Sequence, residues 1–219
     1  MNLREELNKY RREFIRKFPA DKAAIMQAAT DELEADLANR VLLSKGDTAP
    51  DFTLPDARGR SVHLHDRLNE GPVVLTFYRG GWCPYCNLEL RAYQSRLAQL
   101  REAGAQLIAV SPQSPDASLS TAEKNSLEFD VLSDVGCVVA SRYGIVFTLP
   151  SALRSLYLEL GLDLPAANDT ADWQLPVAAT FVIDVDGTIA LAYIDSDYRN
   201  RLEPNDAIAA VRELEKSAA

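Results

Sequence analysis

The segment PVVLTFYRGGWCPYCNLELR, residues 72–91, carries the clearest structural signal in the chain. It starts with an apolar run over 73–78 that is rich in β-branched and aromatic residues, which predicts a buried strand. Two glycines at 80–81 end that run, and helical periodicity then extends over about 84–102. Pro84 suits the first position of a helix. The stretch therefore predicts a strand that passes through a tight loop into a helix.

Two cysteines, Cys83 and Cys86, lie where this loop meets the helix. Cysteines three apart on a first helical turn lie roughly 5–6 Å apart, close enough for a disulfide. The partial positive charge of a helix start stabilises a thiolate, the reactive form of cysteine. A zinc site would need further ligands, and the chain offers only Cys137, His63 and His65. The pattern favours redox chemistry over a zinc half-site or two inert thiols.

Length and composition limit the class of protein. The 219 residues, 47% of them hydrophobic, allow one sizeable core plus an extension. Three cysteines do not indicate a secreted protein held together by disulfides. No apolar run approaches the roughly 20 residues that a membrane span needs. The charged N-terminus lacks the apolar core of a signal peptide. We expect a cytoplasmic protein that needs no cofactor or metal. The net charge of −9 argues against nucleic acid and membrane surfaces as partners.

Residues 1–43 have the periodicity of two helices separated by Pro19. We expect Asp21 to cap the second helix. Short helices need a surface to pack on, so the pair is either a structural extension of the main domain or an arm that forms a homodimer. The apolar positions of the first helix are Leu3, Leu7, Tyr10, Phe14 and Phe18.

Strands and helices alternate after the central helix, which is typical of a parallel α/β sheet. We expect strands at 106–111, 129–132, 178–183 and 188–194, the last two joined by a D-G turn, and helices at 114–127, 133–144 and from Pro204 onward. Residues 145–176 form a less regular insert, with a helix over 150–160 and a loop over 163–174. His63 and His65 alternate with apolar residues, as on the exposed face of an edge strand.

Four segments, 46–54, 76–90, 131–134 and 179–184, resemble the alkyl hydroperoxide reductase/thiol-specific antioxidant (AhpC/TSA) group of the thioredoxin superfamily, in the peroxiredoxin-like branch with a C-x-x-C. The resemblance covers about residues 44–216. It implies a thioredoxin-like α/β domain over 44–219, with a mixed sheet flanked by helices, and a helical extension over 1–43. It also implies a thiol-dependent antioxidant oxidoreductase.

This chain differs from the family pattern at three positions. Cys86 falls where the family has its peroxide-reactive cysteine, and Cys83 replaces the usual hydroxyl residue. The family's proline falls near Arg79, and Ala178 stands where the family has an arginine before the T-F-[VI]-I-D strand. We therefore expect weak peroxidase activity. Arg79 and Arg91 are the candidates to supply positive charge.

Two mechanisms for the Cys83–Cys86 couple follow. In the peroxidase, Cys86 attacks a small hydroperoxide and Cys83 resolves the sulfenic acid. In the disulfide reductase, which the glutaredoxin-like CPYC motif favours, Cys83 attacks a disulfide and Cys86 resolves it. The implied fold places Cys83 at an exposed loop tip and covers Cys86, and Cys137 stays unpaired. A third hypothesis is a redox-sensing interaction module. We expect a thioredoxin- or glutaredoxin-type reductant, and four supporting residues: Arg79, Trp82, Pro84 and Tyr85.

Overall fold

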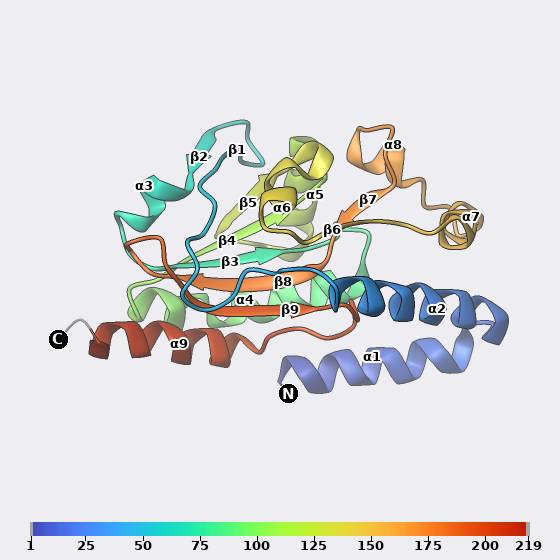
Figure 1. Cartoon of the computed structure of the whole chain (residues 1–219), viewed down its shortest axis with the longest axis horizontal. Helices are drawn as coiled ribbons and strands as arrows, with labels where there is room; N and C mark the ends of the chain where they lie inside the picture. The colour runs from blue at the N-terminus through green and yellow to red at the C-terminus, as the bar shows by residue number, and fades with distance from the viewer. Residues whose placement is uncertain (1, 218–219) are drawn as a thin grey trace.

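The computed structural model describes residues 2–217, and its centre is a five-stranded mixed sheet in the order β5-β4-β3-β8-β9 (Figure 1). β3 is parallel to β4, and β4 to β5, whereas β8 is antiparallel to both β3 and β9. The predicted D-G turn joins β8 to β9, which confirms the hairpin. The strands are β3 (Val73–Phe77), β4 (Gln106–Ser111), β5 (Asp130–Ser133), β8 (Ala178–Ile183) and β9 (Ile189–Asp195).

Every residue of β3 is buried, because elements cover both faces of the sheet. Val74 packs with α4 (Pro84–Glu102) and α9 (Pro204–Ser217) on one face. Leu75 and Phe77 pack on the other face, with residues of the second N-terminal helix and of the loops around it. This alternation follows from the period of two along a strand. α5 (Pro115–Asn125) packs against β5 and α4.

The two predicted N-terminal helices are present and pack on the rest of the chain. α1 (Leu3–Lys17) starts with a reciprocal capping box between Asn2 and Glu5 and lies against α4. α2 (Ala20–Leu37) lies against α7 (Ser151–Glu159). The prediction that Asp21 caps α2 is wrong: Pro19 is the N-cap residue, without a side-chain bond, and Asp21 lies inside the first turn. The apolar stripes therefore find their partner surface within one chain.

The insert over 145–176 is more ordered than predicted. The helix expected over 150–160 is α7, and a short ladder pairs β6 (Val146–Thr148) with β7 (Gln174–Pro176). The expected loop over 163–174 contains α8 (Leu164–Asn168), so that prediction is wrong. Its start is stabilised by Asp163, whose side chain accepts the N–H of Ala166 at 3.2 Å, a capping signal that the sequence carried.

Two further short strands lie beside β5, an edge strand of the sheet. β1 (Thr53–Pro55) pairs with β2 (Ser61–His63), α3 (Leu64–Leu68) follows, and both histidines of this region are exposed, as expected. The helix expected over 133–144 is split into η1 (Val135–Cys137) and α6 (Val138–Arg142), because the backbone turns left-handed there. Within residues 2–217, no helix combines the length and apolarity needed to cross a bilayer.

Candidate active site

Both C-x-x-C cysteines lie at the start of α4, as predicted. Cys83 is the N-cap residue, Pro84 opens the helix and Cys86 lies in its first turn. The loop before them needs glycine: Gly80 has φ +144°, and a Cβ on Gly81 would lie 2.1 Å from Thr121 Oγ1. The end of β3 and the tight loop therefore fix the position of the two sulfurs.

Asn87, one residue beyond the motif, holds the loop against the helix. Its Nδ2 donates to the carbonyls of Gly81 at 2.8 Å and Cys83 at 2.9 Å, and its Oδ1 accepts from Asn125 Nδ2 at 2.7 Å. Gln113 accepts the Gly81 N–H at 2.6 Å. Side-chain amides thus satisfy the backbone of a loop that belongs to no sheet.

The thiols are buried, which contradicts the expectation that Cys83 occupies an exposed loop tip. The exposed fraction is 1% for Cys83 and 0% for Cys86. Both belong to an apolar cluster with Leu3 and Leu7, and Tyr10 packs against that cluster. The first helix of the N-terminal extension covers the start of α4, where the cysteines lie, and the expectation failed because it considered only the thioredoxin-like domain.

Aromatic rings complete the cover. The ring of Tyr10 meets the edge of Tyr85 at 5.1 Å, and Tyr85 meets Tyr198 at 5.6 Å, both in T-shaped geometry. The start of α1 is anchored elsewhere, because the backbone N–H groups of Leu3 and Arg4 donate to the Glu203 carboxylate at 3.3 and 2.6 Å. α1 is thus tied down at its first turn and closes over the thiols further along.

Two N–H donors converge on the sulfur of Cys86. The backbone N–H of Arg79 and Nη2 of Arg201 both lie 3.4 Å from Sγ. Both donors favour the thiolate form of Cys86, although burial and the neighbouring Cys83 outweigh them in the resting protein. Arg91, the other arginine that we considered, instead donates to Asn125 Oδ1 at 3.0 Å on an exposed part of α4, so that proposal is wrong.

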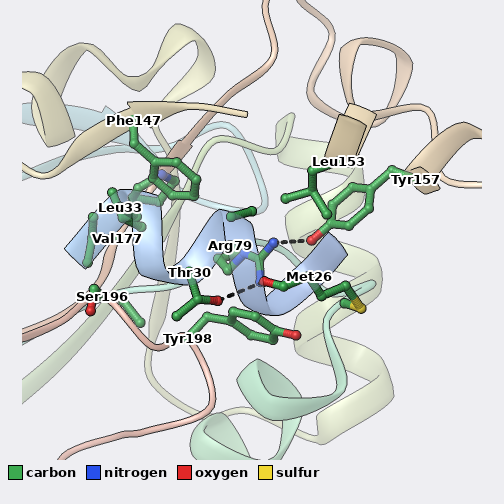
Figure 2. A pocket seen from close by; sticks show the side chains of 13 residues that line it. Met26, Thr30, Leu33, Arg79, Phe147, Leu153, Tyr157, Val177, Ser196 and Tyr198 are labelled. Atoms are coloured by element: carbon green, nitrogen blue, oxygen red, sulfur yellow. Dashed lines mark hydrogen bonds between the residues drawn. The ribbon is translucent and has the colours of Figure 1, made fainter. Parts of the chain in front are cut away.

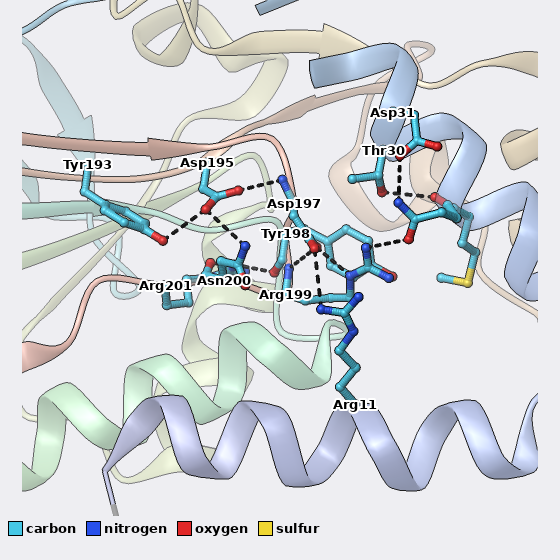
Figure 3. Close-up of polar contacts among 12 residues, drawn as sticks. Arg11, Thr30, Asp31, Tyr193, Asp195, Asp197, Tyr198, Arg199, Asn200 and Arg201 are labelled. Carbon is cyan, nitrogen blue, oxygen red and sulfur yellow. Dashed lines mark hydrogen bonds and ion pairs between the residues drawn. The ribbon is translucent and has the colours of Figure 1, made fainter. Parts of the chain in front are cut away.

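Arg201 was missed by the sequence reasoning. It follows β9, 115 residues after Cys86, and no pattern in the sequence connects the two. Its Nε donates to Glu89 at 2.7 Å, an ion pair whose side chains are each 1% exposed. Nη1 donates to the carbonyls of Tyr198 and Asn200, in a loop that further polar contacts hold in shape (Figure 3). An arginine from this loop therefore supplies charge that Ala178 does not.

Arg79 lies in an aromatic box. Its guanidinium carbon is 4.3 Å from the ring centre of Tyr198, 5.1 Å from Trp82 and 6.0 Å from Tyr157. Nη2 donates to the Tyr157 hydroxyl, as Figure 2 shows, whereas the buried Nε bonds to none of the described residues. Arg79, Tyr157 and Tyr198 line a cavity that Thr30 of α2 also lines. Arg79 is 3% exposed and bonds to no described carboxylate.

The two thiols share one proton and one negative charge. The pKa of Cys83 is lowered to about 6, chiefly because the Cys86 S–H donates to it and also because Arg79 and Arg201 lie near. The pKa of Cys86 is raised by burial and by the charge on Cys83. Burial raises the pKa of Glu89 to about 7 although Arg201 opposes this. The dithiol therefore rests as a monothiolate at neutral pH.

Cys137 belongs to a different part of the core. It is 2% exposed and packs with Phe77 and Val110, on the face of the sheet opposite to the one where Ala109 meets Cys86. Burial raises the pKa of its thiol to about 12. Nothing in this position makes it reactive.

Comparison with known proteins agrees with this geometry. The model of the AhpC/TSA family matches residues 45–192. The chain belongs to the AhpC/TSA family. A chloroplastic peroxiredoxin Q of Sedum lineare is 29% identical over 175 residues, covering 80% of this chain and 79% of that protein. A putative peroxiredoxin of Mycobacterium tuberculosis is 28% identical and covers 78% of this chain and 98% of the relative.

Solved structures confirm the thioredoxin-like fold of this AhpC/TSA protein. Peroxidoxin BcpB from Mycobacterium tuberculosis superposes with a TM-score of 0.62 at 25% identity, covering 78% of this chain and 98% of that one. A peroxiredoxin-like protein from Aquifex aeolicus gives 0.63 at 18% identity, covering 80% and 90%. The chain is a thiol oxidoreductase of the peroxiredoxin type. The matched family segment begins after α1 and α2, so it leaves out α1, the helix that covers the thiols.

Proposed function

We propose that this protein reduces small hydroperoxides, with Cys86 as the attacking thiol and Cys83 as the resolving thiol. The observation that carries the assignment is the pair of N–H donors on Cys86 Sγ. Donors placed at a reacting centre stabilise the charge that develops during transfer. The family's peroxide-reactive position is also that of Cys86.

The reaction starts when the Cys83 thiolate takes the proton of the Cys86 S–H. The Cys86 sulfur attacks the nearer peroxide oxygen, the O–O bond breaks, and Cys83 returns the proton to the departing alkoxide or hydroxide. Cys86 is then a sulfenic acid, and Cys83 is again a thiolate. Cys83 attacks the Cys86 sulfur, an S–S bond forms, and the hydroxyl leaves as water after it takes a proton from solvent.

The sequence also predicted a reductase of protein disulfides, and burial of both thiols counts against it. A protein disulfide must bring its own sulfur into contact with Cys83 or Cys86, which requires α1 to move away. A hydroperoxide needs only a side-chain movement, such as a rotation of Tyr10, and rotations of this kind are fast. The cover therefore selects for small oxidants.

We extend the proposal to the reductant, the cellular compartment and the assembly of the protein. A thioredoxin- or glutaredoxin-type protein reduces the disulfide after α1 has opened, and the cycle runs in the cytoplasm. Residues 1–43 act as an extension of the domain over 44–219. A homodimer remains a prediction, although the apolar stripes that suggested it are covered within one chain.

A steady-state assay tests the function directly. Peroxide turnover with a thioredoxin or glutaredoxin reducing system supports the peroxidase. Turnover of a protein disulfide without peroxide would support the reductase instead. No turnover of either, together with a change of oligomeric state on oxidation, would support the redox-sensing module.

A further inference from the structure

The charges buried around the two sulfurs do not balance without the dithiol. Two arginines, Arg79 and Arg201, and one carboxylate, Glu89, are buried there. The other buried carboxylates of the described residues are engaged elsewhere: Asp56 bonds to Arg60, and Asp134 accepts the N–H groups at the start of α6. One positive charge is therefore left over beside the thiols.

The uncompensated cation is Arg79. Arg201 donates to the Glu89 carboxylate at 2.7 Å. The guanidinium of Arg79 contacts aromatic rings and donates to the Tyr157 hydroxyl, but it pairs with no described carboxylate. Tyr198, whose ring lies against Arg79, stays protonated because burial raises the pKa of its hydroxyl, and burial does the same for Tyr10 and Tyr85 farther along the row of rings. Farther out, Asp197 is already paired with Arg199 and Arg11.

Buried charges are costly unless an opposite charge lies beside them. A single thiolate shared by Cys83 and Cys86 supplies that opposite charge. A disulfide is neutral and supplies none, so oxidation leaves a buried cation without compensation. A reduced form that is stabilised in this way makes its disulfide a strong oxidant.

We propose that Arg79 sets the thiol–disulfide equilibrium of the Cys83–Cys86 couple, by stabilising the dithiol as a monothiolate and leaving the disulfide with an unpaired buried cation. Arg79 acts here as a positioning and charge-compensating residue. The inference rests on the proposed Cys83–Cys86 disulfide but not on the identity of the oxidant.

The equilibrium can be measured against glutathione, a monothiol. In that exchange the Cys83–Cys86 bond breaks, and one S–S bond forms between two glutathione molecules. The two glutathione thiols give up two electrons to the protein sulfurs and release two protons. One of these stays on the dithiol and the other goes to solvent. We would incubate the full chain at pH 8, above the pKa of Glu89, in buffers of varied glutathione ratio and count free thiols by alkylation and mass spectrometry.

Removing the positive charge of Arg79 and removing the negative charge of Glu89 should shift the thiol–disulfide equilibrium in opposite directions. Arg79→Met should favour the disulfide, and Glu89→Gln the dithiol, each on the order of 10- to 100-fold. Arg79→Lys keeps the charge and should stay near the parent protein. Arg96→Met removes an exposed arginine from α4, the helix that carries Glu89, and is the matched control that should not shift the equilibrium. If Arg79→Met fails to fold, Glu89→Gln still tests the sign of the shift, and Arg79→Lys tests whether a positive charge at position 79 is enough to keep the equilibrium of the parent protein.

Shifts of opposite sign support the inference, and equal shifts or none would overturn it. If peptide mapping finds no bond between Cys83 and Cys86 after oxidation, the proposed function fails and this inference fails with it. If the bond forms but the charge variants leave the equilibrium unchanged, only the inference fails.

Discussion

Replacing Arg201 by methionine tests the buried ion pair and the active site together. The side chain donates to Glu89, to two backbone carbonyls and to Cys86 Sγ, and it is almost fully buried. Arg201→Met leaves the Glu89 carboxylate buried without a cation, which should lower the free energy of unfolding by about 3–5 kcal/mol. Losing one donor at the reacting sulfur should also lower the rate of peroxide reduction by about 10²–10³-fold.

The stability loss should depend on pH in a defined direction. Burial raises the pKa of Glu89 to about 7 in the parent protein, and removing Arg201 raises it further. When the pKa of an acid is higher in the folded than in the unfolded state, the folded state binds its proton more tightly. The free energy of unfolding then falls as the pH rises from the unfolded pKa to the folded pKa. The penalty should therefore be smaller at pH 5 than at pH 8. Urea denaturation at both values measures it.

A double variant separates stability from catalysis. Glu89→Leu with Arg201→Met removes both charges, and apolar replacement of a buried ion pair is often close to neutral. Stability should return to within about 2 kcal/mol of the parent, while the peroxide rate measured by stopped flow should stay low. A double variant that is stable and fully active would refute the catalytic role of Arg201. A single variant as stable as the parent would refute the buried ion pair.

Four further outcomes are expected. Tyr10→Ala should speed alkylation of Cys83 by a bulky maleimide at least tenfold, because it opens the cover, and an unchanged rate would show that α1 already moves freely. Thiolate reactivity with iodoacetamide should persist as the pH falls from 9 and be lost through about pH 6, whereas a midpoint near 9 would contradict the lowered pKa of Cys83. Cys137→Ser should leave peroxide turnover unchanged, and a linkage of Cys137 to Cys86 on peptide mapping would contradict this. Light scattering should show a dimer that deletion of residues 1–43 converts to monomer; a monomeric full-length chain would remove the dimer prediction.

Local patterns were enough to predict most of the fold. The apolar run before the glycines, the proline after Cys83 and the D-G turn each act within a few residues of where they stand. The strand, helix and hairpin that they predicted are β3, α4 and the β8–β9 pair. The helix capped by Asp163 could also have been predicted, because its capping residue and the proline after Leu164 are both in the sequence.

The residues that surround the cysteines could not be predicted from local patterns, because they come from distant parts of the chain. Arg201 reaches Cys86 from a loop after β9, and Tyr10 reaches Tyr85 from the N-terminal helix. Periodicity showed that the first helix has an apolar face but not which surface that face covers. The burial of Cys83, and with it the case against protein disulfides, therefore needed the structure.

Trapping of intermediates in two single variants shows which of the two cysteines attacks the peroxide. Each variant would be mixed with one equivalent of hydrogen peroxide, treated with a sulfenic-acid reagent and examined by peptide mass spectrometry. Cys83→Ser should consume the peroxide more slowly than the parent protein, because the thiolate that takes the Cys86 proton is lost, and it should accumulate a sulfenic acid at Cys86. Cys86→Ser should form no sulfenic acid at Cys83. A sulfenic acid at Cys83 in Cys86→Ser, with an unreactive Cys83→Ser, would show that Cys83 attacks first and would contradict the account.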